Sequence, residues 1–438
     1  MQSNQNQTST ITACPGCDLL IPVPEVPDGH YIACGRCGTT LSKSYVNSIE
    51  RVLALSFAGL LLYLPAMFLP LMTLSSLGLK ERGSVVDTCI GFYQNGYVVV
   101  SIITFVTAVI VPFLKIFIPF LTAVCLKSGT KAAMLIPPFK LHKHLEEWGM
   151  VEIYLLGILI TLIKMGDVAR VDFNVGFFCF IGLVLLSMAV SVCMDRRLFW
   201  YYLDRHESSG EDLEIQRLGS LFRESPGLVQ TAANLDLMSC HDCGKLVKAG
   251  PAEQDCPRCN SHLHFRTKKS LSITWALVIT SLILFFPANM LPIMRVDFLG
   301  VPDRSTILDG IIYFFMHGSI GIGLIILIAS ILVPVYKIIG LIIILVTIRS
   351  GKNRYLKQKS KMFRFIEFIG RWSMLDIFVV AILSVLVDFG FLTSIHTAPG
   401  ATYFCLVVIA TMCAAIVFDP RILWDACDPI KPGRPRAT

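Results

Sequence analysis

The sequence has few charged residues: 16% of its 438 residues are Asp, Glu, Lys or Arg, whereas a soluble globular domain carries about 25%. Hydrophobic residues make up 54%. This balance excludes a large soluble domain and also a disordered chain. The start of the chain lacks the basic and apolar segments of a cleaved signal peptide, so the first apolar run is predicted to act as an uncleaved anchor.

Motifs for nucleotide hydrolysis and for the common hydrolases are absent. The chain has no G-x4-G-K-[ST] loop, no G-x-S-x-G elbow, no H-E-x-x-H pair and no kinase motifs. We therefore predict that the protein is not an enzyme, and that any uphill transport draws its energy from an ion gradient or a partner. The basic tail from Lys431 to Arg436 has no interleaved aromatic residues, so nucleic-acid binding is not expected.

Long apolar runs dominate the sequence instead. A helix that crosses a bilayer needs about 20 apolar residues, and eight runs have about this length. They predict an all-α polytopic membrane protein with eight transmembrane helices, with approximate cores at 52–74, 97–126, 149–168, 173–194, 273–294, 311–348, 373–392 and 401–418. The second and sixth runs are longer than a bilayer requires, so these helices are expected to tilt, kink or extend into water.

Basic residues are concentrated in alternate loops. Segments 127–147, 349–371 and 419–438 hold sixteen Lys and Arg, whereas segments 75–96, 166–172, 295–310 and 388–400 hold five. The positive-inside rule therefore places both termini and the long segment 195–270 in the cytoplasm. We expect the basic loop from Arg349 to Arg371 to bind anionic lipid headgroups rather than nucleic acid.

The chain also contains an internal duplication. The segment from Pro65 to Met72 (PAMFLPLM) matches the segment from Pro287 to Met294 (PANMLPIM) at an offset of 222 residues. Later pairs, such as Trp148 with Trp372, follow an offset of 224. Each half is thus predicted to be a cysteine-rich head followed by four spans. Because four is an even number, the two repeats are expected to be parallel.

Eight of the fifteen cysteines form four C-x-x-C pairs. Two such pairs complete a tetrahedral S4 site, and their spacing predicts two metal ribbons. Zinc is the default ion, although iron in a rubredoxin-like site uses the same ligands. A closed four-cysteine site leaves no position for substrate, so folding a small head is the favoured role, with redox or partner sensing as the alternative. The predicted ligands are Cys14, Cys17, Cys34 and Cys37 in the first head and Cys240, Cys243, Cys256 and Cys259 in the second.

These observations predict six domains. They are an N-terminal four-cysteine zinc ribbon at 1–48, a first four-helix transmembrane unit at 49–203, a cytoplasmic linker at 204–235, a second four-cysteine zinc ribbon at 236–268, a second four-helix unit at 269–426 and a basic tail at 427–438.

Charged residues inside the predicted spans are candidates for function, because a charge at membrane depth is expensive and needs a partner, a cavity or a pathway. Lys115 and Lys337 each follow a proline by three residues, so each either lies at an opened helix turn or extends to the headgroups. Glu152 and Asp376 occupy matching positions and are possible partners of these lysines. The network is predicted to be a proton relay or a set of ion pairs that fixes helix register.

Further members of this polar set lie elsewhere in the spans. Lys164 and Asp167 share a helix face near the outer end of the third run, and Asp388 is the counterpart of Lys164 in the second half. Thr411 is a possible hydrogen-bonding partner, although helical threonines usually bond to their own backbone. In the outer loops, Asp87 and Asp309 are expected to cap helices.

The duplicated heads, the P-A-x-x-L-P-[LI]-M segments and the V-P-x-x-K turns together resemble the paraquat-inducible protein A family. The resemblance covers nearly the whole chain. It implies a multi-pass protein of the bacterial inner membrane whose partner is a periplasmic protein with MCE (mammalian cell entry) domains that form a lipid tunnel. By this resemblance the chain would load phospholipid or another lipid into the tunnel or extract it, with a proton gradient as the energy source.

Two other functions compete with lipid transport. The first is that of a redox-responsive membrane protein that uses its four-cysteine metal centres. The second is that of a passive anchor for the periplasmic partner. Redox-active iron would favour the first alternative, and zinc would favour transport. Tolerance of every charge substitution in the spans would favour the anchor.

Overall fold

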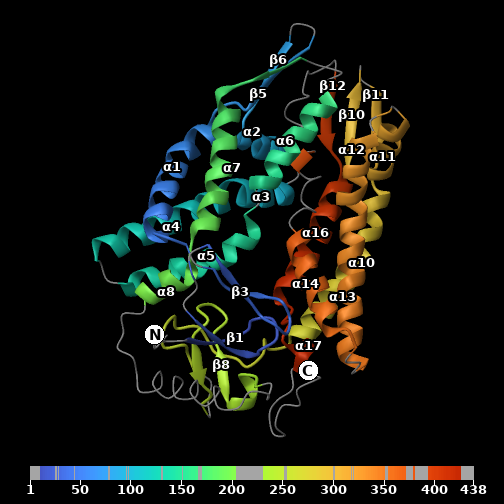
Figure 1. The fold of residues 1–438 in the computed structure, drawn as a ribbon. Coiled ribbons are helices and arrows are strands. Elements are labelled where there is room, and N and C mark those ends of the chain that lie inside the picture. Colours follow the sequence, from blue (N-terminus) through green and yellow to red (C-terminus); the bar gives the residue numbers. More distant parts are fainter. Residues whose placement is uncertain are drawn as a thin grey trace.

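The computed structural model describes residues 10–24, 27, 29–43, 45–76, 79–94, 96, 98–129, 132–149, 151–165, 170–203, 230–250, 254–298, 301–316, 318, 320–350, 354–370, 378–379 and 393–425. These residues are mostly helical. Cysteine-rich hairpins lie at one end of the helices and small β-sheets lie at the other (Figure 1).

Six helical segments among the described residues are long and apolar enough to cross a membrane, and each overlaps a predicted run. They are Ser48–Phe68, Val98–Ser128, Val175–Cys193, Ser270–Met290, Gly323–Ser350 and Pro399–Val417. The third run forms α6 (Val151–Met165), which has 15 residues, and the seventh run, 373–392, lies almost wholly outside the described part of the chain. The count of eight spans stays a prediction.

The helices form two groups that stand side by side (Figure 1). In the first half α1 (Ser48–Phe68) packs along α7 (Val175–Cys193) and α4 (Val111–Ser128). In the second half α10 (Ser270–Met290) packs along α16 (Pro399–Val417) and α13 (Val333–Ser350). One buried apolar cluster includes residues of both halves, and in it the rings of Tyr154 and Phe378 lie 5.3 Å apart. The two groups therefore share a core.

Two three-stranded antiparallel sheets correct the all-α prediction. The first contains β5 (Met72–Ser76), β6 (Leu79–Gly83) and β7 (Arg170–Phe173), with β5 in the middle. The second contains β10 (Met294–Phe298), β11 (Val301–Ser305) and β12 (Thr393–Thr397), with β10 in the middle. Each central strand begins where an apolar run ends, so its first residues read as part of a helix. Strand pairing then satisfies backbone groups that loops would leave to water.

The repeated P-A-x-x-L-P segment turns the chain from helix to sheet. Pro65 lies in the last turn of α1, and Leu69 ends the helix with its N–H bonded to the Pro65 carbonyl at 3.1 Å. The following residues then approach the start of α7 closely, because a Cβ on Gly176 would lie 2.6 Å from the Pro70 oxygen. Gly400 has the same relation to Pro292, at 2.5 Å. The motif thus joins each first span to each last span.

The two loops that contain Asp87 and Asp309 each include a helix with the predicted capping. The helices are α2 (Val85–Gln94) and α11 (Ile307–Met316). Ser84 Oγ donates to Asp87 Oδ2 at 2.7 Å and accepts a bond from the Asp87 N–H at 3.1 Å, and Thr306 and Asp309 repeat the arrangement. The sixth predicted run is therefore divided, because α11 ends at Met316 and α12 (Ile320–Ile326) begins after Gly318, which has a φ of 79°.

Long inner helices contain a π-helical turn before their proline. In the first half α3 (Val98–Phe105) continues through η1 (Val106–Ile110) into α4, and in the second half α12 continues through η4 (Leu327–Leu332) into α13. Tyr63 donates a hydrogen bond of 2.7 Å to the Val109 carbonyl, which lies in η1. A π-turn leaves carbonyls without their usual helical partners, and π-turns often mark functional sites.

Amphipathic helices replace the predicted basic loops at the cysteine-rich end. The first half has η2 (Ala132–Leu135), α5 (Ile136–Trp148) and α8 (Arg196–Leu203), and the second half has α14 (Leu356–Gly370) and α17 (Ile422–Asp425). Buried residues on α14 recur three or four positions apart, from Leu356 through Ser360 and Phe363. This helix therefore covers the end of its own bundle.

The cysteine-rich heads are small β-hairpins. The first head contains β1 (Thr10–Ala13), β2 (Leu20–Val23), β3 (Tyr31–Ala33) and β4 (Thr40–Lys43), and the second contains β8 (Leu237–Ser239) and β9 (Leu246–Lys248). A small shared core joins them through Ala13, Leu20, Ala232, Leu237 and Leu246. The predicted linker boundary at 235 runs through this packed part, which includes η3 (Ala233–Leu235). Residues 204–229 lie outside the description.

Candidate metal centres and intramembrane polar site

The eight predicted ligands form two clusters of four thiols. In each cluster all four sulfur atoms lie within 4.8 Å of one another. The first head has Sγ separations of 3.4 Å for Cys14–Cys37 and 3.6 Å for Cys17–Cys34. The second head has 3.4 Å for Cys240–Cys259 and 3.5 Å for Cys243–Cys256. The structure therefore brings together the same eight sulfur atoms that the C-x-x-C spacing predicted as ligands.

The backbone of each C-x-x-C knuckle explains why the thiols converge. The residue after the second cysteine always has a positive φ, which turns the chain back sharply and is tolerated best by Gly, Asn and Asp. These residues are Asp18, Gly38, Gly244 and Asn260, with φ between 53° and 79°. Their N–H groups donate back to the carbonyl of the first cysteine, for example Gly38 to Cys34 at 2.8 Å.

The two clusters have the chemistry and size that a tetrahedral thiolate site needs. Zinc–sulfur bonds of about 2.3 Å place tetrahedral ligands roughly 3.8 Å apart, close to the separations given above. Four soft sulfur donors suit zinc or iron rather than magnesium or calcium. A metal bound here would hold the knuckles together and leave no coordination position for a substrate.

Each cluster packs beneath the membrane helices of the opposite half. The first cluster shares its apolar environment with Leu345, Phe363 and Trp424 of the second half. The second cluster shares its environment with Phe139, Phe199 and Trp200 of the first half. The heads are therefore crossed relative to the order of the chain, so neither half of the sequence forms a self-contained head and bundle.

Lys337 is fully buried in α13 and hydrogen-bonds to another span. Its relative exposure is 0%, and its Nζ donates to Thr411 Oγ1 of α16 at 2.7 Å. Thr411 in turn donates to the Val408 carbonyl at 2.9 Å, so the predicted return bond to its own backbone also forms. The lysine side chain thus points to the interior of the bundle and does not extend to the protein surface.

Lys115 in the first half has a carboxylate partner. Its Nζ lies 3.4 Å from Glu152 Oε1 at the start of α6, and the exposed fractions of the two side chains are 6% and 29%. The predicted pairing of Lys115 with Glu152 is therefore present. The two matching lysines differ in their described partners, which are a carboxylate in one half and a hydroxyl in the other.

Ser187 is a polar residue that the sequence prediction missed. It lies in α7, its hydroxyl is buried, and it has no hydrogen-bond partner among the described residues. The offset of 224 that links Trp148 to Trp372 also links Ser187 to Thr411, and this signal was available in the sequence. Each half thus has a lysine, an acidic residue and a hydroxyl at corresponding positions.

Four predicted residues of this set cannot be placed as side chains. Asp167, Asp376 and Asp388 lie outside the described residues. Lys164 belongs to α6, but the description does not include its side chain. Their part in a polar network stays a prediction.

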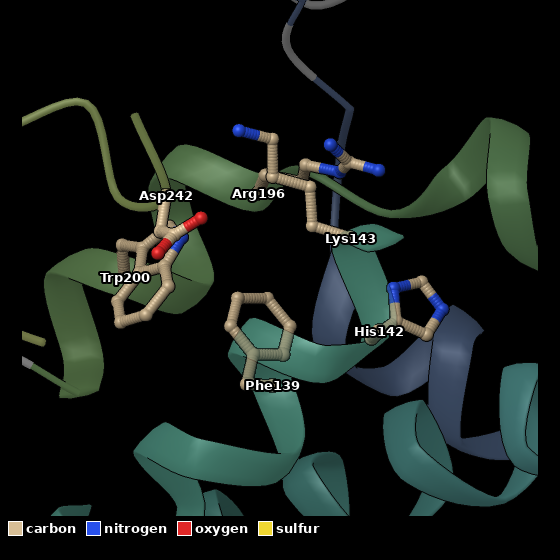
Figure 2. A pocket seen from close by; sticks show the side chains of 6 residues that line it. All are labelled: Phe139, His142, Lys143, Arg196, Trp200 and Asp242. Carbon is tan, nitrogen blue, oxygen red and sulfur yellow. The ribbon is translucent and has the colours of Figure 1, made fainter. Parts of the chain in front are cut away.

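A pocket at the inner end of the first half joins α5, α8 and the second head. Its lining residues, shown in Figure 2, are Phe139, His142, Lys143, Arg196, Trp200 and Asp242. Arg196 forms an ion pair with Glu146, and Lys143 donates to the carbonyl of His241. The basic groups of the pocket thus already have protein partners.

His142 is the most perturbed titratable group of this pocket. Its side chain is 2% exposed, and burial together with the nearby Arg196 charge lowers its pKa to about 3. The imidazole is therefore neutral at pH 7, so its 3.8 Å approach to Glu146 is not an ion pair. Its Nε2–H donates to the Lys115 carbonyl at 3.2 Å, which connects α5 to the lysine-bearing turn of α4.

Comparisons with known proteins agree with the arrangement of the chain. The family model described as paraquat-inducible protein A matches residues 49–204 and 271–428. The chain is 32% identical over 423 residues to the intermembrane transport protein PqiA of Escherichia coli (strain K12), covering 94% of this chain and 95% of that protein. No solved structure gives a significant match.

Two further relatives have comparable coverage. The chain is 30% identical over 417 residues to the lipophilic envelope-spanning tunnel protein A of Escherichia coli (strain K12), covering 94% of this chain and 91% of the relative. It is 27% identical over 424 residues to a probable intermembrane transport protein of Haemophilus influenzae, covering 95% and 96%. The six apolar helices among the described residues, together with the family match, identify the chain as a multi-pass membrane protein.

Proposed function

The chain belongs to the paraquat-inducible protein A family, and from this premise we propose that it is the inner-membrane subunit of a lipid transport system. It loads lipid into, or extracts lipid from, a periplasmic partner with MCE domains. The names of its relatives refer to intermembrane transport and to an envelope-spanning tunnel. The charge asymmetry of its loops supports cytoplasmic termini and ribbons.

The buried bond between Lys337 and Thr411 carries this proposal. A lysine with no exposed surface inside an apolar bundle is costly unless it serves a site. Its described partner, Thr411, is a neutral hydroxyl, so the positive charge is available to an anionic headgroup or to a carboxylate that exchanges protons. We propose that Asp376, Asp388, Lys164 and Asp167 complete this relay, with a proton gradient as its energy source.

The two halves have different roles in this proposal. The pairing of Lys115 with Glu152 neutralises the lysine of the first half and fixes α4 against α6. The lysine of the second half has no such pairing among the described residues, so we place the lipid site in the second half. Zinc in the two heads would supply folding energy and would contact no substrate, because a four-cysteine site leaves no coordination position free.

Lipid transfer by reconstituted protein tests the proposal. We expect Lys337→Met to reduce transfer between vesicles at least tenfold, because a bond to a charged group contributes about 1.5–3 kcal/mol. Thr411→Val should reduce transfer about threefold, since interhelical bonds in membranes average about 0.6 kcal/mol. The matched control is Lys127→Met near the end of α4, whose side chain is 63% exposed and which should transfer lipid normally.

Membrane abundance and bound lipid are measured on the same samples. If both variants transfer lipid as wild type does, the lysine site is wrong. If they lose abundance in proportion to transfer, the bond only stabilises the bundle, and the proposed site is again wrong. Co-purification of a periplasmic MCE-domain protein tests the partner.

A further inference from the structure

We propose that each cysteine ribbon positions the buried lysine of the opposite half: the first ribbon acts on Lys337 through α14, and the second acts on Lys115 through α5. Arg364 and Asp242 are the positioning residues at the two contacts. The inference concerns coupling within this chain, and it stands whatever the bundle transports.

The first contact joins the first ribbon to α14. Arg364 Nη1 donates to the carbonyl of Cys37 at 2.8 Å and to Thr39 Oγ1 at 3.2 Å. Thr39 Oγ1 also lies 3.2 Å from Cys37 Sγ, so the guanidinium contacts the knuckle itself. On the same knuckle, Arg36 stacks over the ring of Trp424 with 4.5 Å to its centroid. All three contacts use the turn that a bound metal would fix.

The same helix then reaches Lys337. Gly370 is the last residue of α14, and a Cβ there would lie 3.8 Å from Lys337 Nζ. One helical turn beyond the lysine, Gly340 packs so closely against α14 that a Cβ would lie 2.6 Å from Ile366 Cδ1. A shift of α14 is therefore transmitted directly to the turn of α13 that holds the lysine, because close-packed side chains leave no free space.

The second contact joins the second ribbon to α5. Asp242 lies between Cys240 and Cys243, and its carboxylate lies 3.3 Å from Lys140 Nζ and 3.5 Å from His144 Nε2. Ser261 Oγ, two residues after Cys259, donates to the same carboxylate at 2.7 Å. Asp242 is thus held by both knuckles of its ribbon and presents its charge to α5.

The path continues from α5 to Lys115. The Nε2–H of His142 donates to the Lys115 carbonyl at 3.2 Å. Gly149 follows α5 directly, and a Cβ on it would lie 3.0 Å from Lys115 Cδ and 3.4 Å from Nζ. Both ribbons therefore reach a lysine by the same route, from a knuckle to an amphipathic helix and from the end of that helix to the lysine.

Contacts between a ribbon and its own half are different. In the first ribbon, Thr12 Oγ1 accepts a bond of 3.3 Å from Arg197, which lies on α8 rather than on α5. The crossed contacts include both the buried clusters and the polar bonds to α14 and α5. The geometry therefore predicts that loss of one ribbon changes the packing of the opposite half.

Hydrogen exchange of the full-length protein in lipid nanodiscs tests this crossing. The first variant, Cys14→Ser with Cys17→Ser, removes two ligands and keeps Cys37 and Thr39. The second, Cys256→Ser with Cys259→Ser, keeps Asp242 and Ser261. We expect the first variant to raise exchange at least tenfold in residues 356–370 and not in 136–148, and the second to do the reverse. Metal analysis should show the loss of one bound ion in each.

Single substitutions keep the test decisive if the cysteine variants do not fold. Arg364→Met should raise exchange in 356–370 and increase the reaction of Lys337 with an amine-acylating reagent at least threefold, while metal content stays unchanged. Arg364→Lys retains one donor and should restore protection, and Lys361→Met is the exposed control. Asp242→Asn should act on 136–148 and Lys115. Changes confined to the same half, equal changes in both halves, or no change would overturn the proposal.

Discussion

His142 makes the docking of α5 sensitive to pH. The charged groups around it are Arg196 from α8, Lys115 from α4, Glu146 and Lys143 from its own helix, and Asp242 from the second head. Burial and the charges of Arg196 and Lys115 lower its pKa to about 3, against 6.5 for an unperturbed histidine. We call α5 docked when it packs against the bundle and opened when it has separated from it. At a pH between these two values, His142 takes up a proton in the opened state and stays neutral in the docked state. The docked state therefore loses stability as the pH falls.

The size of the effect follows from the pKa difference. Each pH unit below the opened-state pKa of 6.5 favours the protonated, opened state by about 1.4 kcal/mol. At pH 5.5, one unit below that pKa, the docked state is therefore less stable by about 1.4 kcal/mol than at neutral pH. At pH 4.5 the loss is about 2.7 kcal/mol. These losses correspond to roughly tenfold and hundredfold increases in the opened population.

Hydrogen exchange of residues 136–148 between pH 7.5 and 5.5 measures this loss, after correction for the intrinsic pH dependence of exchange. His142→Gln provides the matched variant, because its amide can still donate to the Lys115 carbonyl and does not titrate. We expect the wild-type protein to open about ten times more often at pH 5.5, and the variant to show no such increase. The same pH dependence in both proteins would refute the assignment.

Three further predictions concern stability and metal content. Gly400→Ala should lower the free energy of unfolding by about 1–3 kcal/mol, because the added Cβ would lie 2.5 Å from the Pro292 oxygen. Gly310→Ala is the control, because a Cβ there would have no atom within 4 Å. Equal melting temperatures of the two variants would contradict the packing argument. Thr306→Val should destabilise α11 by about 1 kcal/mol through loss of its cap to Asp309, and unchanged hydrogen exchange in that helix would contradict this role. Purified protein should contain about two zinc ions per chain, released by a chelator with exposure of reactive thiols, and a ratio near zero would contradict the interpretation of the cysteine clusters as metal sites.

Local patterns in the sequence predicted what local physics determines. The cysteine clusters follow from C-x-x-C spacing, because a knuckle forms within five residues and needs only a following residue that tolerates a positive φ. The caps at Asp87 and Asp309 are local in the same way. The pairing of Lys115 with Glu152 was predictable because the loop charges place both residues toward the same side of neighbouring apolar runs.

Features that depend on distant parts of the chain were not predictable. Arg364 and Cys37 are separated by 327 residues, and a basic residue on an amphipathic helix looks like any solvated charge. The sheets were missed because their central strands continue directly from apolar runs. Ser187 was missed because a serine in a span has no distinctive signal of its own, and only comparison with Thr411 marks it.

The crossed heads also determine the order in which the molecule can assemble. The first ribbon leaves the ribosome first, yet Trp424, against which it packs, follows Cys37 by about 390 residues. At about 5–20 residues per second, synthesis of that interval takes roughly 20–80 s. During this time the first ribbon has no finished surface to dock on, whereas the second ribbon meets a completed first bundle as soon as it emerges. A metal bound during this interval would hold the knuckles of the first ribbon together before docking, and Trp424 would complete the docking surface about 390 residues later.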